Sequence, residues 1–267
     1  MLPDCELIQH SFYGGHDIQI YPIFDVHLGS PACMEQKFIS FIETVAKTPN
    51  TYLVLGGDLL DNGVKNSVSS VYKNRYMPSE AKKMMAKILE PARDRILCLL
   101  PGNHELRSSK ETDDEPVYDI AAKLDLEHLY RENACYVKIQ LGRETTKNGK
   151  RSHGDVRPTY ALVVQHGAGS GTKTGAAVNR AEDYGFTIDG MDALILGHSH
   201  KIFNTHPGKT VIDLRNNIVR ETDFCVISAT SWLKYAGYPV RGMMRPAPHR
   251  LTTIHLCGSH KEMLVTS

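Results

Sequence analysis

Short apolar runs alternate with longer amphipathic segments over most of the chain. The short runs have the length of buried strands, whereas the longer segments repeat apolar residues at helical spacing. This alternation is typical of a layered α/β fold. It predicts strands at residues 18–24, 51–55, 95–100, 136–141, 159–165 and 193–196, and helices at residues 34–47, 79–89, 116–124 and 176–184.

Turn and cap signals predict the remaining segments. Ser79 is the expected N-cap of the second helix, because its hydroxyl can accept a hydrogen bond from the first turn. Residues 142–158 form the expected flexible excursion, and residues 167–175 form a glycine-rich loop. Beyond residue 200, β-branched residues alternate with turn signals, which predicts antiparallel strands. No repeat or linker interrupts the sequence, so residues 1–267 are expected to form a single domain.

Charge and cysteine content narrow the range of expected partners. The 31 lysines and arginines are offset by 30 aspartates and glutamates, which does not favour duplex nucleic acid, although a local patch could still bind nucleic acid or a nucleotide. The six cysteines form no CxxC pair, so we expect reduced thiols in a cytoplasmic protein. No apolar run has the length of a membrane span, so no membrane partner is expected, and the sequence leaves the oligomeric state open.

Motifs rich in histidine and aspartate follow several of the predicted strands. Each of these residues alone has an ordinary structural explanation. Ligands of open α/β sheets collect beyond the carboxyl ends of the strands, so the motifs together predict one site. In chain order they are Asp25-Val26-His27, Gly57-Asp58-Leu59-Leu60-Asp61, Gly102-Asn103-His104-Glu105, His166 and Gly197-His198-Ser199-His200.

The residue types in these motifs indicate a metal site. In an extended segment, residues two apart face the same side, so Asp25 can bind a metal together with His27. By the same spacing, His198 can act with His200. Mixed carboxylate, imidazole and amide ligands suit Mn²⁺, Fe or Zn²⁺ better than Mg²⁺ or Ca²⁺. Neutral imidazoles cannot balance two divalent cations, so we expect Asp58 to bridge them together with a shared hydroxide.

In order and spacing, the motifs resemble the pattern D-x-H, GD, GNH, H and GHxH of the calcineurin-like metallophosphoesterase superfamily. The resemblance implies a four-layer αββα sandwich with two central mixed β-sheets. It also implies a hydrolase with two divalent transition metal ions, Mn²⁺ first and Fe or Zn²⁺ as alternatives. By position, the implied ligands are Asp25, His27 and His200 for the first metal, Asn103, His166 and His198 for the second, and Asp58 as the bridge.

The same resemblance implies two catalytic residues outside the ligand set. His104 follows the ligand Asn103 and would act on the substrate as general acid or as stabiliser of the leaving oxygen. Asp61 would orient a metal ligand or His104.

A segment near the C-terminus combines aromatic and basic residues. Such residues can stack a base and hold a phosphate, but the segment could equally be a cap loop packed by its aromatic side chains. In its overall look it resembles phage- or plasmid-borne members of the superfamily. Within residues 231–250, the candidate substrate contacts are Trp232, Tyr235, Tyr238, Arg241 and Arg245.

Two positions bear on the type of phosphoester. Ser/Thr protein phosphatases of the superfamily carry arginines where this chain has Asn62 and Pro101. Those arginines would hold a phosphomonoester dianion, so their replacement favours a phosphodiesterase, with a nuclease as one form. Two alternatives stay open. One is a phosphomonoesterase acting on a nucleotide, a small phosphorylated molecule or a phosphoprotein, and the other is a non-catalytic metal-binding scaffold.

Overall fold

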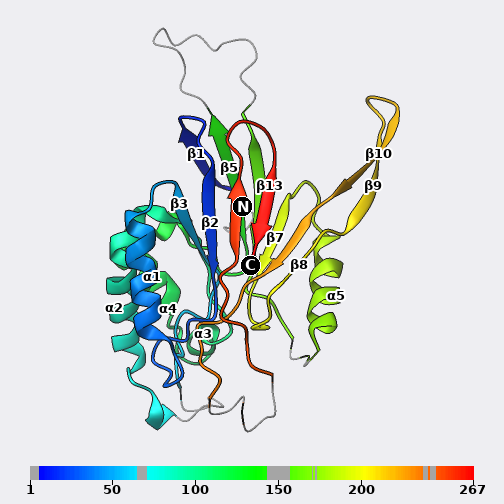
Figure 1. Cartoon of the computed structure of the whole chain (residues 1–267). Coiled ribbons are helices and arrows are strands. Elements are labelled where there is room, and N and C mark those ends of the chain that lie inside the picture. The colour runs from blue at the N-terminus through cyan, green and yellow to red at the C-terminus, as the bar shows by residue number, and fades with distance from the viewer. Residues whose placement is uncertain are drawn as a thin grey trace.

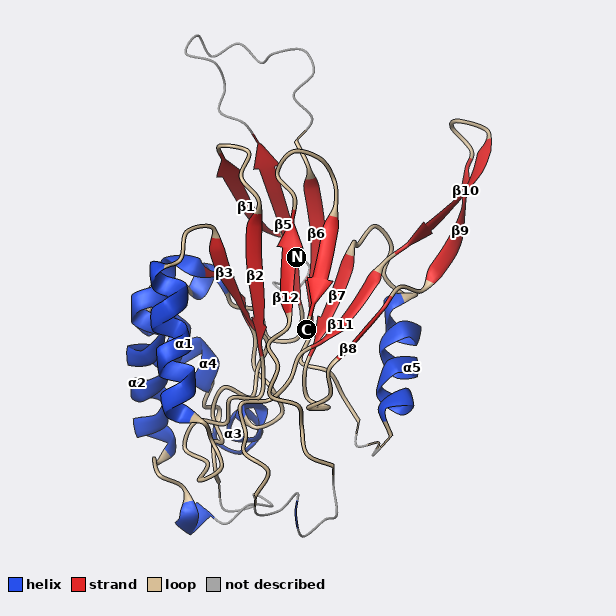
Figure 2. Ribbon diagram, in the orientation of Figure 1, coloured by secondary structure: helices blue, strands red, loops and turns tan. Residues whose placement is uncertain are grey.

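Two β-sheets lie between helices in the computed structural model (Figures 1 and 2), which describes residues 6–64, 71–142, 157–169, 171, 173–236, 240 and 245–267. Both sheets mix parallel and antiparallel neighbours. The arrangement confirms the predicted four-layer αββα sandwich with two central mixed sheets.

The first sheet places three parallel strands side by side. These are β2 (Ile18–Ile23), β3 (Thr51–Leu55) and β4 (Ile96–Leu99), and β12 (Thr253–Leu256) and β13 (Met263–Thr266) extend the sheet antiparallel to β2. Every residue of β3 and β4 is buried, because helices cover one face and the second sheet covers the other. The burial explains why these strands are continuous apolar runs in the sequence.

Three helices pack together on the outer side of this first sheet (Figure 1). They are α1 (Glu35–Lys47), α2 (Pro78–Leu89) and α4 (Pro116–Lys123). The inward face of α1 buries Phe38 and Ile42 at helical spacing, as the sequence pattern predicts. Short 3₁₀ helices lie at Val71–Lys73, Glu90–Arg95 and Glu127–Leu129.

The second sheet has six strands in the order β1-β5-β6-β7-β11-β8. Their bounds are β1 (Ile8–Tyr13), β5 (Cys135–Gly142), β6 (Thr159–Val164), β7 (Ala193–Leu196), β11 (Cys225–Ser228) and β8 (Phe203–Thr205). A single described helix, α5 (Thr174–Gly185), contacts β7 and β11 from the outer side. The hairpin of β9 (Gly208–Asp213) and β10 (Ile218–Asp223) projects from the body of the protein (Figure 1).

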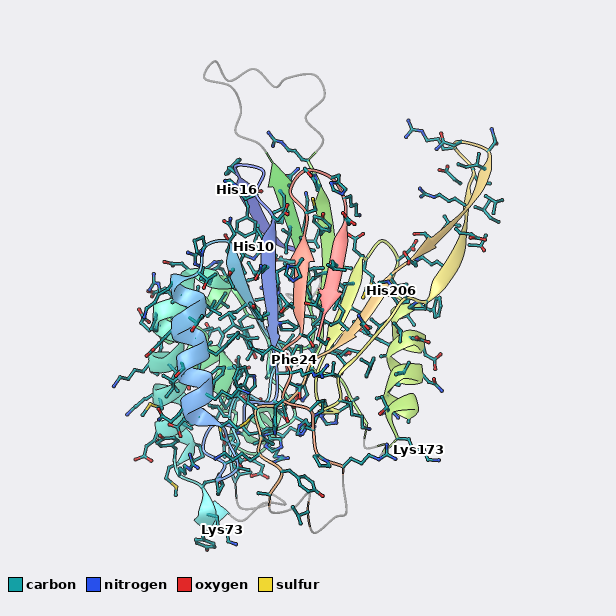
Figure 3. All side chains as sticks on the ribbon, viewed as in Figure 1. His10, His16, Phe24, Lys73, Lys173 and His206 are labelled. Atoms are coloured by element: carbon teal, nitrogen blue, oxygen red, sulfur yellow. The ribbon has the colours of Figure 1, made fainter. Side chains whose placement is uncertain are left out.

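Phe24 connects the two sheets at the edge where the sequence motifs converge. Its ring is fully buried and lies at the centre of the molecule (Figure 3). A Cβ on Gly56 would come within 1.8 Å of this ring, and a Cβ on Gly197 would come within 2.3 Å. Gly56 follows β3 of one sheet and Gly197 follows β7 of the other, so these positions require glycine for the two sheets to approach each other.

The start of α2 differs from its prediction. The N-cap is Met77 and not Ser79, and Pro78 is the first helical residue. The Glu80 carboxylate accepts a hydrogen bond from the Met77 backbone N–H at 3.1 Å. Proline is well suited to the first turn, because a backbone N–H at this position would have no hydrogen-bond acceptor within the helix.

Two elements were absent from the sequence-based prediction. Strand β1 is an edge strand with one partner, and helix α3 (Glu105–Thr112) buries only Glu105 and Ser108. A polar helix of this kind lacks the apolar periodicity on which sequence patterns depend. The predicted excursion at residues 142–158 lies largely outside the described residues.

The direction of one late strand was also predicted wrongly. Most strands after residue 200 are antiparallel to their neighbours, but β11 runs parallel to β7. Strand direction follows from which strand becomes the spatial neighbour, and turn signals in the sequence do not carry that information.

Candidate metal centre

The predicted metal-binding residues converge at the carboxyl ends of parallel strands. The motif of Asp25 follows β2, that of Asp58 follows β3, and that of Asn103 follows β4. From the second sheet, His166 follows β6 and His198 follows β7. Because the strands within each parallel group end at the same edge, residues far apart in the chain meet there.

The backbone of these motifs is not extended, which corrects the reason given for their spacing. Asp25 and His27 have φ values of 53° and 50°, and His198 and His200 have values of 59° and 55°. These values lie in the left-handed region, which is unfavourable in free energy for residues other than glycine. Residues with such backbone conformations are concentrated at functional sites. Alternating left-handed turns, and not strand geometry, therefore bring each pair of side chains to the same centre.

One set of potential ligand atoms comes from Asp25, His27 and His200, which lie within 4.8 Å of one another. The Oδ1 atom of Asp25 is 3.2 Å from Nε2 of His200 and 3.8 Å from Nε2 of His27. Both Asp25 Oδ1 and His27 Nε2 are buried without a hydrogen-bond partner among the described residues. Buried polar atoms without partners are costly, so these two atoms fit the ligand sphere of a cation.

A second set combines Asp58, His166 and His198 within the same 4.8 Å limit. The Oδ2 atom of Asp58 is 3.4 Å from Nε2 of His166. The amide oxygen of Asn103 lies 2.8 Å from Nδ1 of His198 and 3.1 Å from Nε2 of His166. Asn103 therefore faces the same point as the two imidazoles.

Asp58 stands between the two sets. Its Oδ2 atom is also 3.8 Å from Nε2 of His27, and Asp58, His27 and His104 form a third set of ligand atoms within 4.8 Å. All seven predicted metal ligands thus face one centre, and one carboxylate lies within reach of both sets.

The protonation states of the site suit cation binding. Burial lowers the pKa of His27 to about 3, so this imidazole is neutral and can act as a ligand. Burial alone would raise the pKa of Asp58, but contact with His166 and the charges of His166 and His27 outweigh it, so the pKa lies below its usual value.

His166 can balance the charge of the buried carboxylates without a bound metal. Burial lowers its pKa, but the hydrogen bond to Asp58 and the charges of Asp58 and Asp25 outweigh burial and raise the pKa to about 9. A proton on His166 then compensates the carboxylates, and a bound cation can take over that role. The donor set, the unpartnered atoms and the charge therefore all fit divalent cations.

His104 and Asp61 lie at the border of the metal-binding residues. The Nδ1 atom of His104 donates a hydrogen bond to the backbone oxygen of Asp61 at 2.9 Å, because a carbonyl oxygen can only accept. The neutral ring therefore carries its proton on Nδ1, and Nε2 faces Oδ2 of Asp58 at 3.8 Å. The carboxylate of Asp61 lies 3.8 Å from Nδ1 of both His27 and His104, a position consistent with its predicted orienting role.

Glu105 is a residue to which the sequence reasoning assigned no role, although it stands in the GNHE motif. Its carboxylate is fully buried and accepts hydrogen bonds from the backbone N–H groups of Asp58, Leu60 and Gly102 at 2.8–3.0 Å. Burial and the charge of Asp58 raise its pKa to about 7, against the opposing hydrogen bonds from Leu60 and Gly102. Glu105 thus ties the loop after β3 to the loop after β4. The available sequence signal was an acidic residue directly after Asn103-His104.

Replacing Glu105 by alanine is expected to lower the free energy of unfolding by about 2–5 kcal/mol. The variant leaves three buried backbone N–H donors without their acceptor, and each such loss costs about 1–3 kcal/mol, partly relieved by relaxation. Urea unfolding of both proteins measures the difference, with the exposed Glu43 of α1 replaced by alanine as control. An unchanged midpoint in the Glu105 variant would show that the carboxylate does not hold the two loops together.

The aromatic part of the predicted substrate-binding segment is not exposed as expected. Trp232 is only 2 % exposed and packs against Phe38 and Phe41 of α1, with ring centroids 5.0 and 5.3 Å apart. A buried indole cannot stack on a substrate base, so the prediction for Trp232 is wrong. Tyr235 and Arg245 are exposed, whereas Tyr238 and Arg241 lie outside the described residues.

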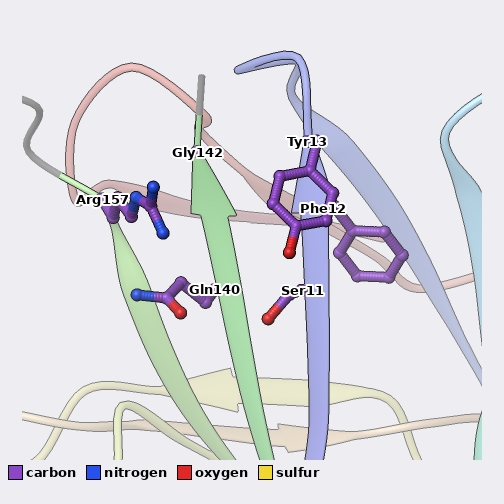
Figure 4. Close-up of a pocket in the computed structure, with 6 residues that line it drawn as sticks. All are labelled: Ser11, Phe12, Tyr13, Gln140, Gly142 and Arg157. Atoms are coloured by element: carbon purple, nitrogen blue, oxygen red, sulfur yellow. The ribbon is translucent and has the colours of Figure 1, made fainter. Parts of the chain in front are cut away.

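Two pockets flank the sandwich without containing the metal-binding side chains. A small one of about 10 Å³ lies between Ser11, Gln140 and Arg157 (Figure 4), at the end of β5 and the start of β6 and therefore at the opposite end of the second sheet from His166. The other, of about 190 Å³, includes Gly167 and Ser199, which adjoin the metal ligands along the chain. Neither pocket replaces the metal centre as the candidate functional site.

The αββα sandwich and its centre of carboxylates and imidazoles define the class of metal-dependent phosphoester hydrolases. The chain belongs to the calcineurin-like phosphoesterase family, whose sequence model matches residues 25–202. The match covers every predicted metal ligand and confirms the resemblance inferred from the motifs.

Solved structures with low sequence identity are also similar to the chain. One is a conserved uncharacterized protein of Streptococcus pneumoniae TIGR4, described as a predicted phosphoesterase, with 10% identity, a TM-score of 0.35 and coverage of 94% of this chain and 98% of that one. Another is a metallophosphoesterase from Sphaerobacter thermophilus, with 12% identity, a TM-score of 0.39 and coverage of 90% and 83%. No curated protein sequence matches the chain. None of its described helices is long and apolar enough to cross a membrane.

Proposed function

We propose that the chain is a phosphodiesterase that works with two divalent cations, Mn²⁺ first among them. The observation that carries this proposal is the position of Asp58, whose carboxylate lies between two sets of ligand atoms. Asp25, His27 and His200 would hold one cation, and Asn103, His166 and His198 would hold the other. When bound, such cations stabilise negative charge on the phosphoryl oxygens and lower the pKa of an attacking water.

His104 is the proposed acid for the leaving group. The hydrogen bond from Nδ1 to Asp61 fixes the ring and leaves Nε2 facing the centre. In its protonated form the imidazole can donate the Nε2 proton to the departing oxygen, which would otherwise leave as a high-energy alkoxide. The backbone N–H of His104 donates a hydrogen bond to Oδ1 of Asp58 at 2.8 Å, so the backbone of His104 is held directly against the Asp58 carboxylate.

A diester fits the charges of the site better than a monoester. Asn62, which stands where related protein phosphatases carry an arginine, is 2 % exposed, and its amide donates to the His104 carbonyl and to Ser108 Oγ. Its side chain holds the start of α3 and cannot contact a substrate. Pro101, at the second such position, is buried as well. A diester carries one negative charge fewer and needs less cationic binding.

Hydrolysis of bis-p-nitrophenyl phosphate and of p-nitrophenyl phosphate in Mn²⁺ tests the proposal. We expect faster cleavage of the diester, and no cleavage above background by the Asp58→Ala variant. Dinucleotides, RNA, DNA and cyclic nucleotides would then separate a nuclease from other phosphodiesterases. Faster cleavage of the monoester would overturn the proposal in favour of a phosphomonoesterase. A chain that binds no transition metal would be the non-catalytic scaffold.

A further inference from the structure

An arginine that forms no ion pair with the described carboxylates lies beside the proposed acid. Arg107, on the first turn of α3, is half-buried, and its Nη1 atom is 3.5 Å from Nδ1 of His104. Among the residues that the structure describes, no carboxylate oxygen lies within 4.0 Å of its guanidinium nitrogens. Its charge still acts on Asp61, where it opposes the rise in pKa that burial causes.

The contact with His104 does not use the hydrogen-bond donors of Arg107. The Nδ1 atom already donates to the backbone oxygen of Asp61, so it cannot also accept from the guanidinium. A distance of 3.5 Å is moreover at the long limit for such a bond. The guanidinium therefore keeps its fork of donors for another acceptor.

The position of Arg107 is held firmly relative to the metal ligands. Helix α3 starts at Glu105, whose carboxylate binds the backbone of Asp58, Leu60 and Gly102. One turn later, Ser108 accepts a hydrogen bond from the amide of Asn62. Arg107 lies between these two anchors, so its guanidinium starts from a fixed backbone position, as preorganised binding groups do.

The placement indicates which part of the substrate Arg107 meets. The Nε2 atom of His104 faces the metal centre, whereas Arg107 approaches the same ring on its Nδ1 side. The guanidinium therefore lies on the side of the ring away from Nε2, the atom that would donate the proton. With His104 as the acid, a group bound by Arg107 would be carried by the leaving group.

We infer that Arg107 binds a second phosphate carried by the leaving group, which makes an oligonucleotide or a similarly polyphosphorylated ester the preferred substrate class. The inference rests on the proposed role of His104 as the acid. An arginine fork matches the oxygens of a phosphate through paired hydrogen bonds, and such charged bonds are among the strongest in proteins. This cation, from helix α3, would compensate for the arginines absent at positions 62 and 101 without contacting the scissile group.

Dinucleotides that differ only in a terminal phosphate test the inference. The substrates are TpT, pTpT and TpTp with Mn²⁺, and product analysis shows which nucleoside leaves. The variants are Arg107→Met, which keeps the apolar stem, and Arg107→Lys, which keeps the charge without the fork. Arg93→Met is the matched control, since it removes the same charge from the surface at the far end of α2.

For the substrate whose leaving nucleoside carries the phosphate, we expect Arg107→Met to lower kcat/KM by about 10- to 100-fold, with partial recovery in Arg107→Lys. The kcat/KM of Arg107→Met on TpT should differ from wild type by less than about 3-fold. Arg93→Met should have the wild-type kcat/KM on all three substrates. Equal losses on all three dinucleotides would instead make Arg107 a residue that positions His104. No loss on any of them would also overturn the inference.

A binding measurement keeps this result separate from the proposed diester preference. Calorimetric titration of metal-loaded protein with adenosine 3′,5′-bisphosphate and with AMP should show tighter binding of the bisphosphate, and Arg107→Met should remove that difference. If the chain cleaves only monoesters, adenosine 3′,5′-bisphosphate and AMP serve as substrates instead. A ratio of their hydrolysis rates that is the same in wild type and Arg107→Met would then overturn the inference. Equal binding of both nucleotides by the wild-type chain would overturn the inference while leaving the phosphodiesterase proposal intact.

Discussion

Asp58→Ala is expected to lose at least about 10³-fold in kcat/KM on bis-p-nitrophenyl phosphate, and to lose bound Mn²⁺ as well. The carboxylate of Asp58 lies within reach of ligand atoms from both sets. It also supplies the negative charge that neutral imidazoles such as His27 cannot provide. Without it, neither set keeps enough charge to hold a divalent cation strongly.

Mass spectrometry of the metal content, made on the same sample as the rate measurement, checks both parts of this prediction. The control is Asp189→Ala, which removes an exposed carboxylate that pairs with Lys209 and should change neither value. Normal Mn²⁺ content in the Asp58 variant would show that Asp58 is not a central ligand. Normal activity would exclude the proposed site altogether.

His104→Ala should keep its metal and lose about 10²- to 10⁴-fold in kcat on a dinucleotide, the range typical of a lost acid. The reason is geometric, because Nδ1 bonds to the Asp61 carbonyl and Nε2 alone faces the centre. The loss should be smaller on bis-p-nitrophenyl phosphate, since p-nitrophenolate leaves readily without a proton.

The dependence on the leaving group separates acid catalysis from a structural effect. A structural effect would lower the rates on both substrates by the same factor. The control is His128→Ala, a change to an exposed histidine outside the centre that should leave both rates unchanged. Equal losses on both substrates in the His104 variant would therefore contradict its role as an acid.

Much of the centre could be predicted from the sequence because its chemistry is local to short motifs. The apolar runs before Asp25, Asp58 and Asn103 identify buried parallel strands, and such strands end at a common edge. Periodicity likewise predicted α1 and α5 to within about two residues at each end, the usual precision of such patterns.

The polar supports of the centre could not be predicted in this way. Helix α3 lacks an apolar face and depends on Glu105 and Asn62, which bind Asp58 and Ser108 more than forty positions away along the chain. The left-handed backbone at Asp25 and His198 has no sequence signature of the kind that glycine would provide. Trp232 appeared able to bind substrate because an aromatic residue among basic ones looks the same in sequence whether it is exposed or packed in the core.

The sequence by itself determined the layered α/β class, the family and the identity of the candidate metal ligands, because strand periodicity and ligand chemistry are properties of short segments. Only the tertiary structure decided how close Asp58, the bridge expected from the sequence, lies to both sets of potential ligand atoms, and that Glu105 joins two loops. It also decided that Arg107 lies beside His104 with no ion pair to a carboxylate among the described residues. Those relations depend on distances that only folding sets. The packing of the two sheets brings His166 to Asp58, the pairing of β3 with β4 brings Glu105 to the loop of Asp58, and the start of helix α3 places Arg107 beside His104.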